Sequence, residues 1–353
     1  MPELAQTAPA GAAALPRARA RRRSQLRISA WMISAAALLA SLILFVPLPR
    51  ALTSWVASHS AGWMLPDPGA SSAPGRVARK FTGLWLQHNI AAQLYRQEQV
   101  PEGFGDADRV AFRLARLKPK FISQPELPHA PAGAPAPLAG FGWCDSITGF
   151  AASVLSPEFS QVEIVGLYDQ QVRGGHSFGR LWSDELNDWL YFDLWPDEVV
   201  VFRSRPGQPA QFLARMHPVG NRDLPNANPE AVRRMYDRAH EGLVHNRLQP
   251  TLGAYIFTRL WNVAAHGNTA PAGAAEVIAG VPQPARPAEF STAERNRTAA
   301  PRAYVNARME HLMGDLQAAR ALYAQVLATD GDGLSTFRQA ARIFIDRIDA
   351  AGR

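Results

Sequence analysis

The residues with the clearest potential for chemistry are Cys144, which is the only cysteine among 353 residues, His176 and Asp193. A thiolate can attack an acyl carbon, an imidazole can take the thiol proton and return it to the leaving group, and a carboxylate can orient the imidazole and support its positive charge. Because a lone cysteine forms no internal disulfide, Cys144 is either a buried core residue or a catalytic nucleophile. The three residues predict acyl transfer through a Cys-His-Asp triad.

The apolar spacing predicts the elements that carry these residues. From Cys144 to Leu155, apolar side chains recur every three or four positions, which predicts a helix with the cysteine in its first turn. A helix start suits the sulfur because unpaired N–H groups and the positive dipole end stabilise a thiolate and an oxyanion. Four strands are expected, over residues 162–168, 176–182, 189–195 and 198–202.

Strand parity predicts that the histidine and the aspartate meet. Residues two apart share a face, so His176 and Trp182 lie on one side of their strand, and Trp189 and Asp193 lie on the same side of the next. Pairing Trp182 with Trp189 makes His176 and Asp193 diagonal neighbours, roughly 7–8 Å apart at Cα. A shift of two residues would set them directly opposite. Either register leaves the two side chains within reach.

The order of three motifs resembles that of the transglutaminase-like superfamily, relatives of the papain fold. These motifs are Gly-x-Cys at a helix start, Gly-His opening an aromatic strand, and Asp in the following strand. The resemblance covers roughly residues 77–205, and its specific motifs lie within 142–195. It implies an α+β fold with a papain-like core, in which helices pack on an antiparallel sheet. It also implies that Cys144, His176 and Asp193 are the catalytic residues of a bacterial member.

Other residues near the motifs are candidates for substrate or oxyanion contacts. Aromatic side chains that could line an acceptor cleft or a sugar platform are Trp143, Trp182, Tyr191 and Trp195, although an aromatic face at strand spacing is more often core. Residue type alone offers Trp85, Gln87 and Trp143 as a second oxyanion donor. In the alternative interpretation, His176 is a satisfied core histidine and Asp193 a turn residue or the ion-pair partner of Arg180.

The N-terminus predicts a membrane anchor. Six arginines precede an uncharged stretch from Ile28 to Val46, whose 19 residues give roughly 29 Å, the thickness of a bilayer core. A cleaved signal peptide usually has a shorter apolar region of about 7–15 residues, so we expect an uncleaved signal anchor over residues 28–48. The positive-inside rule places residues 1–27 in the cytoplasm and the main domain in the periplasm, with a single pass through the inner membrane.

The rest of the chain divides into three predicted parts. Residues 49–76 are rich in Ala, Ser, Pro and Gly and predict a stalk next to the membrane. Residues 77–205 hold the triad and open with two helices separated by a break at 101–103. The part over 206–353 is predicted to be helical, with helices at 228–247, 251–265, 303–327 and 334–350 and a linker at 267–287. Residues 314–330 look like half of one tetratricopeptide unit, which we interpret as an ordinary helical hairpin.

Charge and motif spacing argue against other function classes. The sequence pI is about 10.0, but residues 1–27 carry a net charge of +5 out of +7, so the remaining chain is not a nucleic-acid surface. His240 and His245 flank Glu241 at an interval of five, which turns the two imidazoles about 140° apart and disfavours a zinc site. We expect no metal and no cofactor, because no phosphate loop, nucleotide fingerprint or zinc cysteine set is present.

Two functional hypotheses follow. In the first, the chain is a membrane-anchored extracytoplasmic enzyme that transfers acyl groups from amide bonds of a protein or peptide, to water as a peptidase or amidase, or to an amine as a transglutaminase. In the second, the triad is vestigial and the chain is a structural or binding module that contacts the machinery of envelope or exopolysaccharide assembly. Asp145 favours the second, because a carboxylate beside the thiol would partly cancel the field that stabilises a thiolate.

Overall fold

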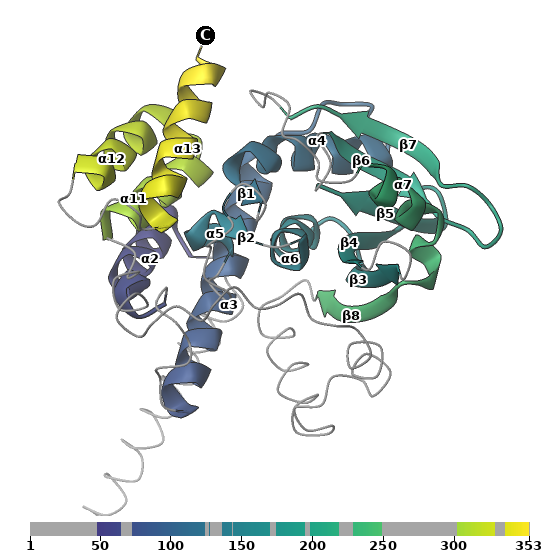
Figure 1. The fold of residues 1–353 in the computed structure, drawn as a ribbon, viewed down its shortest axis with the longest axis horizontal. Helices are drawn as coiled ribbons and strands as arrows, with labels where there is room; N and C mark the ends of the chain where they lie inside the picture. The colour runs from purple at the N-terminus through teal and green to yellow at the C-terminus, as the bar shows by residue number, and fades with distance from the viewer. Residues whose placement is uncertain are drawn as a thin grey trace, which may run out of the picture. The chain divides into compact units, whose positions relative to one another are not determined.

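The computed structural model describes residues 48–64, 73–123, 127, 136–142, 144–169, 174–194, 198–218, 229–248, 302–328 and 336–352. The architecture is α+β, with helices packed against a largely antiparallel sheet and a helical C-terminal region, as Figure 1 shows. At this level the predicted fold class is confirmed. Among the described helices, none combines the length and the apolar character that a membrane span requires. The predicted anchor lies outside the described residues except for Leu48.

The main sheet has six strands in the order β7-β6-β5-β4-β3-β8, and every neighbouring pair is antiparallel. The strands are β3 (Val162–Asp169), β4 (Gly174–Ser183), β5 (Asp188–Asp193), β6 (Val199–Arg203), β7 (Gln211–Met216) and β8 (Leu243–Leu248). Trp182 pairs with Trp189, so the predicted register of the β4–β5 hairpin is confirmed. The sheet also continues beyond residue 205, where the predicted domain ended.

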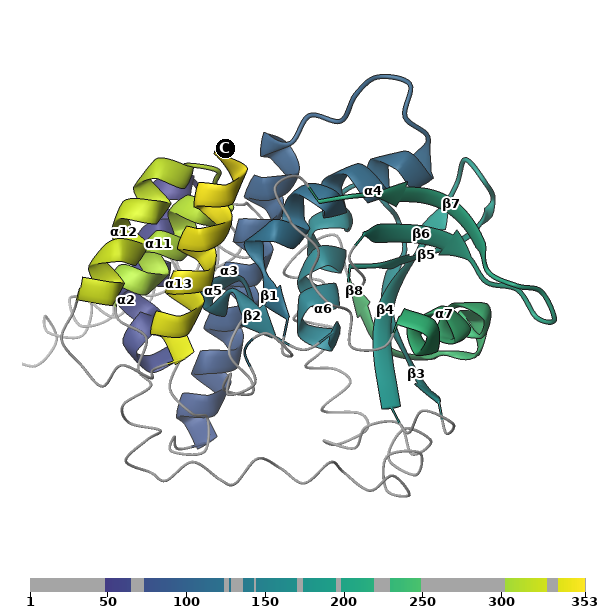
Figure 2. The same ribbon diagram turned by 45° about the horizontal axis from the view of Figure 1, so that its top comes forward.

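Helices cover both faces of the sheet. On one side lie α4 (Asp106–Leu117) and α6 (Cys144–Leu155), and on the other lie α7 (Pro229–Asp237) and the short turn η4 (Ala239–Glu241). The neighbouring residues Ile164 and Val165 of β3 define the two sides: Ile164 meets α6 at Gly149, while Val165 joins the buried cluster under Tyr236. Figure 2 shows α6 and α7 on opposite sides of β4.

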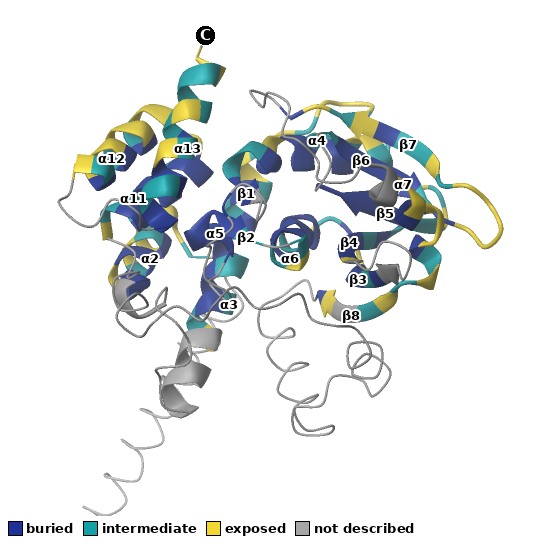
Figure 3. Cartoon of the chain, in the orientation of Figure 1, coloured by how far each residue is buried: buried dark blue, intermediate teal, exposed yellow. Residues whose placement is uncertain are grey.

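The cluster on the α7 side is largely aromatic. Phe178, Tyr191 and Phe202 come from three adjacent strands, and Tyr236 of α7 closes the cluster with its ring 4.5 Å from that of Phe202. Figure 3 shows buried residues where the sheet and its helices meet, and exposed residues on the outer face of the C-terminal helix α12. Packing of these large rings is the main apolar support for the strands that carry the candidate triad.

The helix predicted over residues 228–247 ends early. It stops at Asp237, η4 follows, and residues 243–248 form β8, which pairs with β3. Local periodicity missed β8 because an edge strand depends on hydrogen bonds with β3, about 80 residues earlier in the chain. Strand β7 was also missed in a part predicted to be helical. The predicted helix at 251–265 and linker at 267–287 lie outside the described residues.

Where a stalk was expected, the structure has helix α2 (Arg50–Met64). The chain is already fixed just before this helix, because the backbone N–H of Leu48 donates to Asn89 Oδ1 at 2.8 Å and Gln93 donates to the carbonyl oxygen of Leu48 at 3.0 Å. Both side chains belong to α3 (Ala73–Gln97), the first long helix of the body. The described part of the expected stalk is thus a helix that packs on α3 and on the C-terminal helices.

The C-terminal helices pack on the segment that leads to Cys144. They are α11 (Arg302–Leu312), α12 (Leu316–Ala328) and α13 (Thr336–Ala351), and α11 and α12 form the predicted hairpin. The segment comprises α5 (Ala136–Ala139) and β2 (Phe141–Gly142); β2 pairs in parallel with β1 (Ile122–Ser123), which follows η2 (Lys118–Lys120). The Tyr304 hydroxyl donates to the carbonyl oxygen of Ala139 at 2.5 Å. The C-terminal helices therefore help to place the backbone from which Cys144 emerges.

Arg308 of α11 is fully buried at this contact. Its Nε and Nη2 atoms each donate to the carbonyl oxygen of Pro137 at 3.3 Å, and its guanidinium lies 4.6 Å from the centre of the Phe344 ring. Among the described residues, its hydrogen-bond partners are uncharged groups. Gly140 adopts a φ of +75°, and a Cβ atom there would lie 2.5 Å from Arg308 Nε.

This contact makes the junction sensitive to one methyl group. We expect Gly140→Ala to lower the free energy of unfolding by about 3 kcal/mol or more, of which about 1–2 kcal/mol is left-handed backbone strain and the rest is overpacking. Gly103→Ala is the matched control, because Gly103 has a φ of +84° and nothing within 4 Å of the added methyl. Urea unfolding measures the stability of both variants. Equal losses of stability would mean that Arg308 and Phe344 move aside for the added methyl group without an energetic cost.

Candidate active site

Cys144 is the first residue of α6, as the sequence predicted, and its side chain is partly exposed. One turn further on, the Thr148 hydroxyl donates to the carbonyl oxygen of Ser177 at 3.2 Å. Ser177 directly follows His176 on β4, and both Thr148 and Ser177 are buried. This hydrogen bond fixes the start of α6 against the strand position that carries the histidine.

The structure brings the three predicted triad residues together. His176 Nε2 donates to Asp193 Oδ2 at 2.7 Å, and the Cys144 thiol lies close enough to His176 to help raise the pKa of the imidazole. Because Nε2 is occupied by the aspartate, the nitrogen left for the thiol is Nδ1. His176 therefore interacts with both the Asp193 carboxylate and Cys144. Arg180, which the alternative interpretation paired with Asp193, forms its ion pair with Glu163 instead.

Burial and charge act in opposite directions on the histidine. The side chain of His176 is 6% exposed and that of Asp193 is 0% exposed. Burial lowers the pKa of His176, but the adjacent charge of Asp193, with hydrogen bonds to Asp193 and Cys144, raises the pKa to about 10. His176 is thus an imidazolium at neutral pH, the charge state that stabilises a thiolate beside it.

A fourth residue, which the sequence did not indicate, contacts the triad. The hydroxyl of Tyr236 donates to Asp193 Oδ2 at 2.8 Å, the same oxygen that His176 contacts. Tyr236 lies on α7, outside the region of resemblance, and is 2% exposed. Burial, followed by the charge of Asp193, holds the pKa of Tyr236 well above its usual range, so the hydroxyl keeps its proton. No local motif marked this residue, because only packing of α7 on the sheet brings it to Asp193.

Asp145, next to the nucleophile, is exposed and turned toward its own helix. Its Oδ1 atom accepts the backbone N–H of Ser146 at 2.8 Å and lies 3.3 Å from the Ser146 hydroxyl. The carboxylate therefore satisfies an N–H group of the first helical turn. Exposure to water screens its charge relative to the buried pair of His176 and Asp193.

One of the candidates for a second oxyanion donor is excluded by its contacts. Gln87 Nε2 donates to Ser153 Oγ at 2.8 Å, nine residues beyond Cys144 and about 13 Å along the axis of α6. Gln87 therefore ties α3 to α6 instead of facing the thiol. Trp85 is buried on α3. Trp143 lies outside the described residues.

Two of the aromatic residues predicted to contact substrate, Tyr191 and Trp182, are described, and both make other contacts. Tyr191 is buried in the α7-side cluster with its ring stacked 5.6 Å from that of Phe202, so it belongs to the core. Trp182 is six residues from His176 on β4, about 20 Å along the strand, where its ring meets that of Trp189 edge-on. Trp195 lies outside the described residues.

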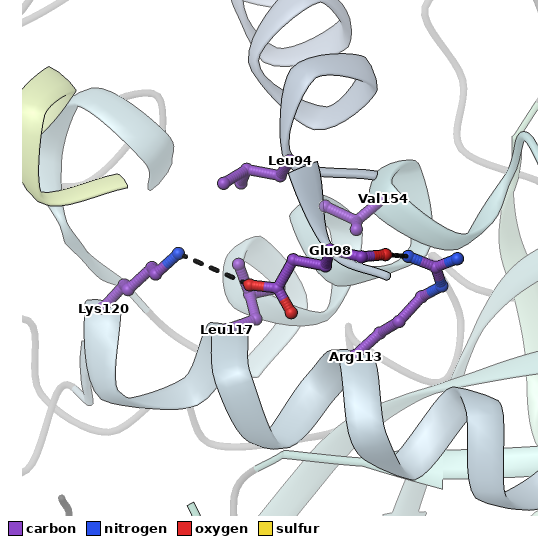
Figure 4. Close-up of a pocket in the computed structure, with 6 residues that line it drawn as sticks. All are labelled: Leu94, Glu98, Arg113, Leu117, Lys120 and Val154. Atoms are coloured by element: carbon purple, nitrogen blue, oxygen red, sulfur yellow. Dashed lines mark hydrogen bonds and ion pairs between the residues drawn. The ribbon is translucent and has the colours of Figure 1, made fainter. Parts of the chain in front are cut away.

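A small hollow lies elsewhere, between α3, α4 and α6. Figure 4 shows its lining, in which Glu98 lies between Lys120 and Arg113. Burial raises the pKa of Glu98, with the charge of Lys120 acting against it. Val154 on its wall is ten residues after Cys144, about 15 Å along α6, so the hollow is separate from the triad. In the part of the chain that the structure describes, no three His, Cys, Asp or Glu side chains are grouped to hold a metal ion.

The charge state of His176 predicts a pH effect. Because the folded pKa of about 10 exceeds the unfolded value of 6.5, the stabilisation from this group is complete below pH 6.5 and is lost as pH rises toward 10. We expect NMR titration to show the His176 imidazole still protonated at pH 8, and the free energy of unfolding to fall between pH 6.5 and 10 more steeply than in His176→Gln. An NMR midpoint near 6.5 would contradict the assignment.

Comparison of this chain with protein-family models, with curated proteins and with solved structures finds no match. Its function is therefore inferred from its own residues and their geometry.

Proposed function

We propose that this chain is a membrane-anchored, extracytoplasmic enzyme that transfers acyl groups from amide bonds through a thioester on Cys144. The observation that carries the proposal is the position of His176, which is hydrogen-bonded to the buried Asp193 carboxylate and lies close enough to the Cys144 thiol to be influenced by it. A structural cysteine needs no hydrogen bond to an imidazole that a buried carboxylate orients, whereas a nucleophile does. The transglutaminase-like, papain-like fold suggested by the sequence motifs is part of this proposal.

The geometry supports a two-step reaction. His176 Nδ1 holds the thiol proton while the sulfur of Cys144 attacks the carbonyl carbon of the amide, and the negative charge moves to the carbonyl oxygen. As the tetrahedral intermediate collapses, the C–N bond breaks, the imidazolium protonates the departing amine, and a thioester remains. The backbone N–H of Cys144, at the start of α6, is suited to bind the oxyanion.

The second step decides the type of enzyme. Water or an amine attacks the thioester carbon, His176 takes the proton of the attacking group, and the C–S bond breaks to restore the thiol. Water gives a peptidase or amidase, and an amine gives a cross-linking transglutaminase. An enzyme held at a wet envelope surface favours hydrolysis of a protein or peptide.

Anchoring is proposed from the sequence of residues 1–48. The arginines before the apolar stretch support a cytoplasmic N-terminus and a periplasmic catalytic domain. Because Leu48 is hydrogen-bonded to Asn89 and Gln93, a span that ended near residue 46 would hold the domain within a few residues of the membrane. We therefore propose that the substrate is processed close to the inner-membrane surface.

One observation favours a second candidate function, namely the exposed carboxylate of Asp145 beside Cys144. In this alternative the triad is inactive, and the chain is a binding module in envelope or exopolysaccharide assembly. The two candidates differ in the reactivity of Cys144 and in its dependence on His176.

Alkylation of Cys144 by iodoacetamide separates the candidates. At pH 6, where a free thiol with a pKa of about 8.5 reacts slowly, we expect the wild-type rate to exceed that of His176→Ala at least tenfold, because the imidazolium stabilises the thiolate. Mass spectrometry of the intact chain counts the label on its single cysteine.

The control for altered folding is His240→Ala, which removes a half-buried histidine that contacts Ser204 on another part of the sheet. Its alkylation rate should equal that of the wild type. Slow wild-type labelling that is unchanged in His176→Ala would support the binding module instead of the enzyme.

The anchor is tested separately in the full chain. We expect the wild type to stay with membranes after alkaline carbonate washing, and Leu38→Arg with Leu39→Arg to release it, since each arginine costs roughly 2.5–3.5 kcal/mol at the centre of a span. Gln317→Arg with Ala321→Arg is the matched control, because both positions are exposed on α12. Release of the wild type itself would contradict the anchor.

A further inference from the structure

We propose that Tyr236 is a positioning residue of the triad, which acts on His176 through Asp193. Its hydroxyl and His176 Nε2 donate to the same carboxylate oxygen, at 2.8 Å and 2.7 Å. Tyr236 touches neither the imidazole nor the thiol through a hydrogen bond that the structure shows, so its effect on the nucleophile must pass through the carboxylate.

Two donors on one oxygen restrict how the carboxylate can turn. A carboxylate with a single partner can rotate about its Cβ–Cγ bond and exchange Oδ1 for Oδ2, because the two oxygens are equivalent. The Tyr236 donor comes from α7 and the His176 donor from β4, so rotation would break hydrogen bonds to two separate elements. Tyr236 therefore keeps Oδ2 aimed at the imidazole, and the imidazole in turn keeps Nδ1 aimed at the sulfur.

The hydroxyl also stabilises the charge that the histidine requires. Asp193 is fully buried, and a buried carboxylate stays ionised only when it is paired and hydrogen-bonded. The other charged groups that act on Tyr236 are Glu198 and Arg215, which have opposite effects on it. Asp193 is thus the main charged group that the Tyr236 hydroxyl stabilises.

The environment of Tyr236 suits this role. Its ring is held by Phe202 at 4.5 Å, Phe212 at 5.9 Å and Phe178 at 6.4 Å between ring centres, so the hydroxyl has little freedom to turn away. The high pKa that burial and Asp193 give the phenol keeps it a donor throughout the pH range in which the histidine is charged.

Tyr236→Phe tests the proposal because it removes one oxygen and keeps the ring. We expect the alkylation rate of Cys144 to fall about tenfold, the loss typical of a hydrogen bond to a charged group. In the Asp193→Asn background the same substitution should cost nothing further, because Tyr236 acts only through the carboxylate. Ser183→Ala is the matched control: it also removes a buried hydroxyl that donates to a carboxylate, that of Asp106, at the far end of β4 from His176.

A second measurement follows the His176–Asp193 hydrogen bond directly. In proton NMR the Nε2 proton of such a bond gives a low-field signal, which we expect to shift or broaden in Tyr236→Phe and to stay unchanged in Ser183→Ala. A purely structural role for Tyr236 would leave this signal in place.

The inference rests on the proposed function only for the alkylation rate. Wild-type rate and unchanged low-field signal in Tyr236→Phe would overturn the positioning role while leaving the enzyme proposal intact. If wild-type alkylation is slow and independent of His176, the enzyme proposal fails and the NMR signal alone decides the role of Tyr236.

Discussion

The buried carboxylate of Asp193 is the constraint on which the candidate site depends. A negative charge with no exposure to water is stable only where positive charge and hydrogen-bond donors surround it, and its known donors come from β4 and α7. The charged histidine compensates the carboxylate and is in turn made basic by it. The charge of the imidazole near Cys144 is therefore a consequence of the burial of Asp193.

Cys144 is held in place by other elements. Cys144 follows β2, whose approach is fixed by hydrogen bonds from Tyr304 and Arg308 on α11, while Thr148 fixes the helix after it to β4. The C-terminal helices thus support the same site as the sheet. This explains why a helical region of the chain that looked separate in the sequence buries an arginine against the segment before the cysteine.

Whether a feature of the site could be predicted depended on how far apart its contacting residues lie in the sequence. The β4–β5 hairpin was predictable because a short, mostly polar turn between Ser183 and Asp188 fixes its pairing locally, and strand parity then places His176 beside Asp193. β8 was not predictable, since its partner β3 is distant in the chain and its edge position leaves a weak alternation of apolar residues. Tyr191 was misassigned for a related reason: an aromatic residue at strand spacing has the same pattern whether it faces a substrate or a core.

The sequence by itself determined that His176 and Asp193 lie together, that α6 begins at Cys144 and that the fold class is α+β, because each follows from local periodicity or parity. The tertiary structure alone decided that Tyr236 shares the oxygen of Asp193 with His176, and that α11 supports the approach to Cys144. Both contacts join residues more than 40 positions apart, and no local pattern encodes which helix will pack over a given strand.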